Sequence, residues 1–230
     1  MFVLAIDTAG PFCSAAICAP SDPARPLAAE SEAIGRGHAE RLMPMIESVL
    51  ARAGHGYNEI GLIAVTTGPG SFTGLRIGIS AARGLALALG VPARGPSVLD
   101  VLAQQAFNEM DEAATAVVAL DAGRGDLFVQ AVRGAERAPV LAASRLSISE
   151  AAQGLAMRSG RIGLIGSGAP ALADRLGTSI APELIGDADH VDCAILASMV
   201  FAGAGVSPPR PLYLRAPDAK PQAGKAVARA

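Results

Sequence analysis

The sequence contains no tryptophan, and only 3% of its 230 residues are aromatic. It therefore has few of the flat rings on which single-stranded bases stack. Charged residues are also scarce, at 17%, and only Lys220 and Lys225 are lysines. The net charge of -2 gives no basic field that would attract nucleic acid. We therefore expect any RNA substrate to be held by another molecule.

Cysteine is rare as well, and its spacing argues against two kinds of site. Cys13, Cys18 and Cys193 are an odd number and form no CxxC pair. In an extended strand, Cys13 and Cys18 would point to opposite faces. We expect neither a disulfide framework nor a thiolate metal site.

We expect neither a membrane-spanning apolar run nor a leader segment. No run approaches the roughly 20 apolar residues that a membrane helix needs, and residues 1–7 carry no basic region before Asp7. We expect a cytoplasmic protein without a membrane partner. What the chain does contain is apolar: 51% of its residues are hydrophobic, which predicts a packed globular protein of one large domain or two lobes.

The chain divides into two similar halves and a tail. We predict a first lobe over residues 1–110, a smaller second lobe over 111–207, and a partly disordered C-terminal segment over 208–230. In the first lobe, the patterns predict strands at 2–7, 14–18, 27–34, 60–67 and 91–94, and helices at 38–53, 74–89 and 98–107. In the second, they predict strands at 116–121, 127–133 and 162–165, and helices from near 149, at 169–176 and at 191–201.

Both halves begin with a strand that ends in aspartate, at Asp7 and at Asp121. This hint of an internal duplication predicts the two-lobed α/β architecture of actin, the sugar kinases and Hsp70, in which the two turns face each other across a nucleotide cleft. Asp7, Thr8 and Asp121 are the candidates for a vestigial cleft of this kind. In the alternative interpretation, each aspartate simply caps its turn by accepting backbone N–H bonds.

Residues 68–76, Gly-Pro-Gly-Ser-Phe-Thr-Gly-Leu-Arg, are the most distinctive stretch. They have the glycines of a phosphate-binding loop but lack the Lys-Ser/Thr ending of a Walker A motif. After them, small residues recur every four positions, at Gly74, Gly78, Ala82 and Ala86. Such a stripe lets another segment approach the helix closely. It can face this protein's own lobe or a partner.

Metal and nucleophile signals are weak. No two of the histidines, His38, His55 and His190, have the four-residue spacing that pairs ligands on a helix. No GxSxG elbow or Cys-His pairing indicates a covalent nucleophile.

Four stretches together, residues 5–8, 38–44, 68–86 and 211–215, resemble the TsaB (YeaZ) family of bacterial proteins. That family acts in biosynthesis of threonylcarbamoyladenosine on tRNA, and it is related to the catalytic subunit TsaD, whose metal site uses a His-x-x-x-His pair on a helix. Here His38 is followed four residues later by Leu42. A site missing one ligand binds metal weakly. The resemblance therefore implies a noncatalytic subunit without metal or cofactor.

The resemblance also implies partners: a TsaD-like catalytic subunit bound through helices of the first lobe, a TsaE-like ATPase recruited through the complex, and tRNA bound only through the complex. The target would be the adenosine next to the anticodon of ANN-decoding tRNAs. The predicted partner interface consists of His38, Arg41, Leu42, Met45, Gly70, Phe72, Thr73, Gly74, Arg76, Gly78 and Ala82.

Two rival interpretations remain. One is an autonomous ATP-binding enzyme of the sugar kinase and actin superfamily, which needs a glycine-rich adenosine-binding turn in the second lobe. Residues 166–168, Gly-Ser-Gly, are the candidate for that turn. The other is a homodimer with no role outside self-association, because a surface that meets TsaD can also meet a second copy.

Overall fold

The computed structural model describes residues 1–111, 114–134, 136–156, 160–177, 180, 182–186 and 190–214. Most of the predicted C-terminal tail, residues 215–230, lies outside the described residues.

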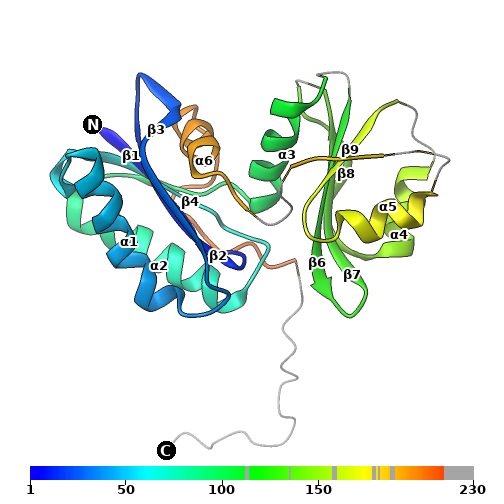
Figure 1. Ribbon diagram of the computed structural model, residues 1–230, viewed down its shortest axis with the longest axis horizontal. Helices are drawn as coiled ribbons and strands as arrows, with labels where there is room; N and C mark the ends of the chain where they lie inside the picture. The colour runs from blue at the N-terminus through cyan, green and yellow to red at the C-terminus, as the bar shows by residue number, and fades with distance from the viewer. Residues whose placement is uncertain are drawn as a thin grey trace, which may run out of the picture.

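Two five-stranded sheets form the frame (Figure 1). The first contains β1 (Phe2–Asp7), β2 (Phe12–Ala19), β3 (Asp22–Ala33), β4 (Ile60–Val65) and β5 (Ala93–Arg94). The second contains β6 (Thr115–Gly123), β7 (Asp126–Arg133), β8 (Ala138–Ser147), β9 (Ile162–Ile165) and β10 (Glu183–Leu184).

The two sheets repeat one topology. The strand order is β3-β2-β1-β4-β5 in the first and, in the matching direction, β8-β7-β6-β9-β10 in the second. In each, the central strand pairs antiparallel with its hairpin partner and parallel with a later strand, β4 or β9. The predicted two-lobed α/β fold is confirmed.

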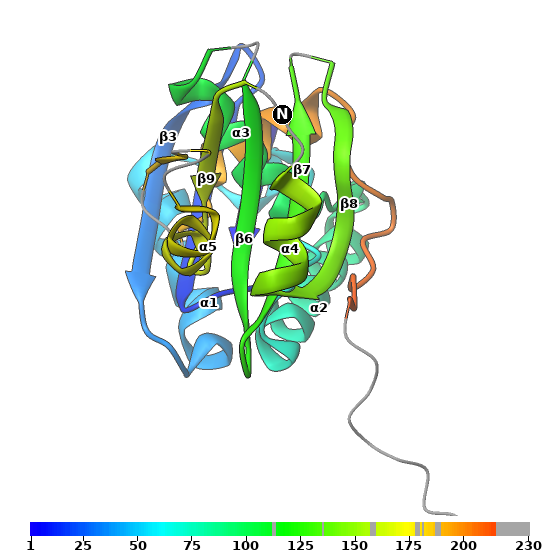
Figure 2. The same ribbon diagram turned by 90° about the vertical axis from the view of Figure 1, so that its right-hand side faces the viewer.

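Helices form three further layers around these sheets. α1 (His38–Ala53) and α2 (Phe72–Leu89) cover the outer face of the first sheet, and a 3-10 turn (Tyr57–Glu59) precedes β4. α4 (Ile148–Ala156) and α5 (Ala169–Leu176) cover the outer face of the second (Figure 2). α3 (Val98–Glu109) and α6 (Cys193–Phe201) lie between the two sheets (Figure 1).

These two middle helices are exchanged between the lobes. α3 belongs to the first half of the chain, yet it packs against β6, β7 and β9 of the second sheet. α6 belongs to the second half, yet it packs against β1, β2, β3 and β4. The predicted division at residue 110 therefore separates each helix from the sheet on which it packs.

Side-chain alternation along the strands explains why the first sheet is buried on both faces. Leu4 and Ile6 face α1 and α2, whereas Val3 and Ala5 face the middle layer. The predicted opposite orientation of Cys13 and Cys18 is confirmed, because they lie in the outer and the middle core respectively.

α2 is unusual among the helices because it is apolar and yet largely open to solvent. By length and composition its 18 residues could cross a membrane, and only 28% of them are buried. The expectation concerned apolar runs without charged residues, and α2 does not contradict it because Arg76 and Arg83 interrupt the helix. A core helix of a soluble protein passes the same test, so the absence of a membrane partner stays a prediction.

Candidate functional site

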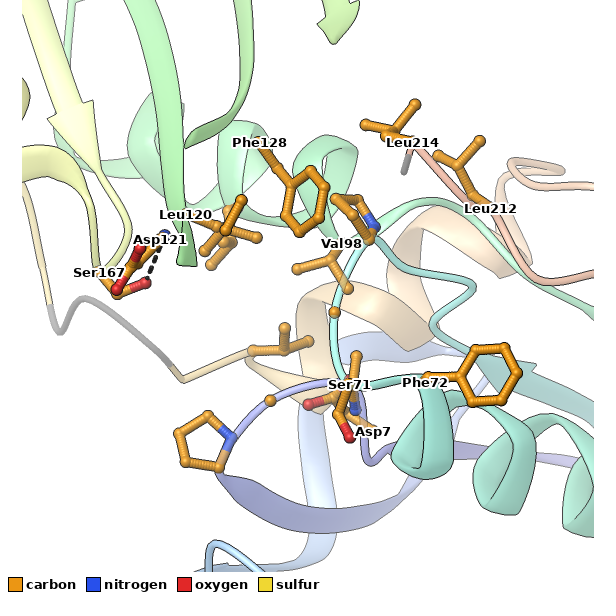
Figure 3. Close-up of a pocket in the computed structure, with 18 of the residues that line it drawn as sticks. Asp7, Ser71, Phe72, Val98, Leu120, Asp121, Phe128, Ser167, Leu212 and Leu214 are labelled. Atoms are coloured by element: carbon orange, nitrogen blue, oxygen red, sulfur yellow. Dashed lines mark hydrogen bonds between the residues drawn. The ribbon is translucent and has the colours of Figure 1, made fainter. Parts of the chain in front are cut away.

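A cleft of about 1180 Å³ lies between the lobes (Figure 3). Its walls come from the β1–β2 turn, the start of α2, α3, the end of β6, and the C-terminal segment. The lining is mostly apolar, with Val98, Leu120 and Phe128 between the polar groups of the two lobes. Among the described residues that line it, Arg76 is the single cation.

Asp7 and Asp121 line this cleft from opposite sides, as the duplication predicts (Figure 3). Asp7 is 1% exposed, and its carboxylate accepts hydrogen bonds from the backbone N–H of Ala9 (3.2 Å) and from the hydroxyl of Thr66. Burial raises the pKa of this carboxyl above its usual value, and the two hydrogen bonds oppose that effect. The aspartate therefore caps its turn and also forms part of the cleft wall.

Asp121 occupies the equivalent position in a different environment. Its side chain is exposed and accepts a hydrogen bond from the backbone N–H of Gly123 at 2.8 Å. Its own backbone N–H donates to the hydroxyl of Ser167 at 3.0 Å. The second turn is thus tied to the start of α5 while its carboxylate stays in water.

Thr8 has a different role from the one predicted. It is 1% exposed, is not part of the cleft lining, and donates its hydroxyl to the carbonyl of Gly74 at 2.8 Å. A side-chain carbon on Gly74 or Gly78 would lie only 2.1 Å from the carbonyl oxygen or 2.4 Å from the hydroxyl of Thr8. Because both distances are far below contact, glycine at these positions lets α2 approach β1 closely.

The structure corrects the predicted orientation of the small-residue stripe. Gly74, Gly78 and Ala82 are buried against the first sheet, so they pack within their own lobe and face no partner.

The same correction applies to α1. Leu42 and Met45 are 1% and 0% exposed and belong to the core beneath the helix. His38 is 6% exposed, and its Nε2 donates to the carbonyl of Phe12 at 3.1 Å. Arg41 is partly exposed and pairs with carboxylates of β3. Helical periodicity identified this face of α1, but the face meets the sheet.

Four residues of the predicted interface are exposed at the start of α2: Gly70, Phe72, Thr73 and Arg76. The Arg76 guanidinium carbon lies 3.8 Å from the centre of the Phe72 ring. The ring of Tyr213, from the C-terminal segment, lies 5.6 Å from that of Phe72. Sequence reasoning missed Tyr213 as a site residue, although it is one of only two tyrosines.

In the part of the chain that the structure describes, no three His, Cys, Asp or Glu side chains gather where they could hold a metal ion. The three cysteines are free and buried.

Comparison with known proteins identifies the family. The family model described as "TsaD: tRNA N6-adenosine threonylcarbamoyltransferase" matches residues 31–159, more than half of the chain. The "tRNA threonylcarbamoyladenosine biosynthesis protein TsaB" of Escherichia coli is 38% identical over 128 residues, which are 56% of this chain and 53% of that protein. The chain belongs to the TsaB/YeaZ members of this family.

Two further relatives cover nearly the whole chain. An uncharacterized protein of Mycobacterium tuberculosis is 31% identical over 96% of this chain and 95% of its own length. The solved structure of YeaZ from Pseudomonas aeruginosa has a TM-score of 0.72 and 28% identity, covering 93% of this chain and 99% of that one. By contrast, the chain spans about half the length of the curated TsaB relatives that it matches.

Proposed function

We propose that this TsaB/YeaZ member is a noncatalytic subunit in biosynthesis of threonylcarbamoyladenosine on tRNA. It pairs with a TsaD-type subunit that carries the transfer chemistry, and a TsaE-type ATPase joins through the complex. The target is the adenosine next to the anticodon of ANN-decoding tRNAs, and the proposed location is the cytoplasm. The relatives named as TsaB biosynthesis proteins support the pathway.

The proposed pairing with TsaD rests on the outward face of α2. Thr73, Ser80, Gly84 and Leu87 are exposed on it, three, four or seven residues apart along the helix. Gly84 has no atom within 4 Å of where a side-chain carbon would lie, and Leu87 is 86% exposed. Small residues beside one large apolar side chain allow a second helix to approach closely. Met43, on the adjacent α1, is a further exposed apolar side chain, at 38%.

The residues on α1 support the noncatalytic part of the proposal. Where the TsaD pattern has a second histidine, Leu42 is buried in the core and offers no ligand atom. His38 already uses its Nε2 on the Phe12 carbonyl.

The autonomous ATP-binding enzyme is the second candidate, and it is favoured by one observation: Asp7 and Asp121 line one cleft. Turnover of ATP by the purified chain, lost in Asp7→Ala, would favour that candidate.

The pairing is tested by isothermal titration of the chain with the TsaD of the same organism. Leu87→Lys places a charge on the proposed interface and should weaken binding by about 2 kcal/mol or more, roughly thirty-fold. Leu184→Lys is the matched control, because Leu184 is 56% exposed on the second lobe. Unchanged binding in Leu87→Lys, or equal loss in both variants, would contradict the proposed interface. Gel filtration of the chain alone tests the homodimer, which should give way to the mixed species.

A further inference from the structure

Three side chains from two distant parts of the chain meet at the edge of the cleft. Phe72 is the first residue of α2, Arg76 follows one turn later, and Tyr213 comes from the C-terminal segment. The guanidinium of Arg76 covers the Phe72 ring, and the two aromatic rings are tilted by 33° at 5.6 Å. The rings are nevertheless 54% and 48% exposed. We call these three residues the platform.

Hydrogen bonds fix both sides of the platform. The N–H of Leu212 donates to the carbonyl of Thr67 at 2.7 Å and so holds the segment that carries Tyr213. The Ser71 hydroxyl caps α2 by accepting from the N–H of Gly74 at 3.2 Å, which holds the turn that carries Phe72. The rings are thus arranged before any ligand arrives, so binding costs little side-chain entropy.

The groups at the start of α2 favour an anionic ligand, whereas the cleft beyond them also contains Asp7 and Asp121. In the described part of the chain, no ion pair joins Arg76 to a carboxylate. The first turn of α2 holds no acidic residue, and the N-terminal end of a helix carries partial positive charge. Partly exposed aromatic rings beside an arginine are the elements that stack bases and hold phosphate in single-stranded nucleic acid binding.

We propose that Phe72, Arg76 and Tyr213 are the surface on which this chain contacts an unpaired nucleotide of RNA. The base would stack on the rings and the phosphate would meet Arg76. That the RNA is a tRNA rests on the proposed function. The proposal revises the expectation from composition that RNA is held only by another molecule.

The proposal also removes Phe72 and Arg76 from the predicted protein interface. Leu87, at the far end of the proposed TsaD contact, lies 15 residues beyond Phe72 along α2, or about 22 Å at the rise of a helix. The concave edge of the cleft suits a single protruding base, whereas the outward face of α2 suits a second helix.

Fluorescence polarisation with a labelled transcript of an ANN-decoding tRNA tests the platform. The full chain is used both alone and mixed with its TsaD. Phe72→Ala and Tyr213→Ala should each lower tRNA affinity about five-fold or more, the effect of losing one stacked base. Phe72→Tyr and Tyr213→Phe should restore most of it. Arg76→Ala should reduce the slope of log affinity against log salt by about 1.

Arg83→Ala is the matched control, because it removes the same charge from an exposed position on the same helix. Its affinity should stay within about two-fold of the wild type, since surface changes away from a contact have small effects. TsaD binding is measured in parallel. It should be unchanged in all platform variants.

Two results would overturn the proposal. The first is tRNA affinity in Phe72→Ala and Tyr213→Ala equal to that of the wild type. The second is parallel loss of TsaD binding, which would make the platform a protein contact. If no mixed species forms at all, the proposed function fails instead. The platform is then tested on the chain alone with a labelled oligouridine, and failure of the wild type to bind it would overturn the platform too.

Discussion

The two lobes share one strand order but present different outer surfaces. α1 and α2 have 16 and 18 residues, whereas α4 and α5 have 9 and 8. Among the described residues, large exposed hydrophobic side chains lie on both α1 and α2, at Met43, Phe72 and Leu87, and none lies on α4 or α5. These side chains do not form one cluster, because Phe72 and Leu87 lie near opposite ends of α2. The comparison shows that the two lobes share one frame and differ in the length and the exposed side chains of their outer helices.

The largest expected effect tests which face of α2 belongs to which function. Gly78→Leu should destabilise the fold by about 3 kcal/mol or more, because its side chain would collide with Thr8 beneath the helix. Gly84→Leu, six residues on and facing open space, should leave the melting temperature nearly unchanged and weaken TsaD binding. Thermal unfolding monitored by circular dichroism gives the first result, and titration with TsaD gives the second. Similar melting temperatures for the two variants would refute the assignment of faces.

The next effect compares the two turn aspartates. Because burial raises the pKa of the Asp7 carboxyl, the folded state holds its proton more tightly than the unfolded state. The contribution of this proton to stability is therefore fully present below the unfolded pKa of about 3.9 and is lost as pH rises through the folded pKa. Asp7→Asn keeps the acceptor without the charge, so it should raise the melting temperature at pH 7 to 8.

The advantage of Asp7→Asn should shrink as the pH falls toward 4. Asp121→Asn is the control, because that side chain is exposed, and its effect on unfolding free energy should stay within about 0.5 kcal/mol. Melting curves from pH 4 to 8 make the comparison. An Asp7→Asn variant that loses stability at pH 8 would mean that the native carboxylate is better stabilised than its burial suggests.

A smaller effect concerns the two exchanged helices, which both begin with a side-chain cap. The Ser97 hydroxyl accepts from the N–H of Asp100 at 3.0 Å, and the Asp192 carboxylate accepts from that of Ala194 at 2.7 Å. Ser97→Ala and Asp192→Ala should each cost about 1 kcal/mol of unfolding free energy. Chemical denaturation measures both. Unequal costs would show that one exchanged helix matters more to the fold than the other.

The smallest effect uses one helix glycine from each lobe. Gly84 in α2 and Gly154 in α4 both have room for a methyl group. Alanine at either position should stabilise the protein by about 0.5 to 1 kcal/mol, which corresponds to a rise of roughly 2 to 4 °C in Tm for each kcal/mol in a chain of this size. Only Gly84→Ala should also lower TsaD affinity. A change in TsaD affinity from Gly154→Ala would contradict the restriction of the interface to the first lobe.

The elements with strong periodicity were predictable from the sequence, and α5 has the predicted bounds of 169–176. β8 (Ala138–Ser147) was missed because it contains Pro139 and is only partly buried at the sheet edge, where it pairs with β7 alone. Such an edge strand shows weak alternation. The exchange of α3 and α6 could not be predicted from the sequence either. Periodicity indicates that a helix has a buried face, but it does not indicate which sheet covers that face.

The same distinction applies to the site. The opposed placement of Asp7 and Asp121 followed from the internal duplication. The direction of the α2 stripe did not, because both Gly78 and Gly84 lie on faces rich in small residues. Tyr213 lies beside Phe72 because a backbone hydrogen bond joins two segments that are far apart in the chain. The residues around Tyr213 have no periodic pattern from which this contact could be predicted.

The crossed placement of α3 and α6 makes the polypeptide a natural candidate for a split reporter. A cut between residues 110 and 111 would leave each helix on the fragment that lacks the sheet on which it packs. The piece 1–110 would lack the helix that covers Val3 and Ala5, and the other piece would lack the one that covers Ala116 and Val118. Each fragment alone should therefore aggregate, while the two expressed together should rebuild one folded body, with each half supplying what the other cannot make.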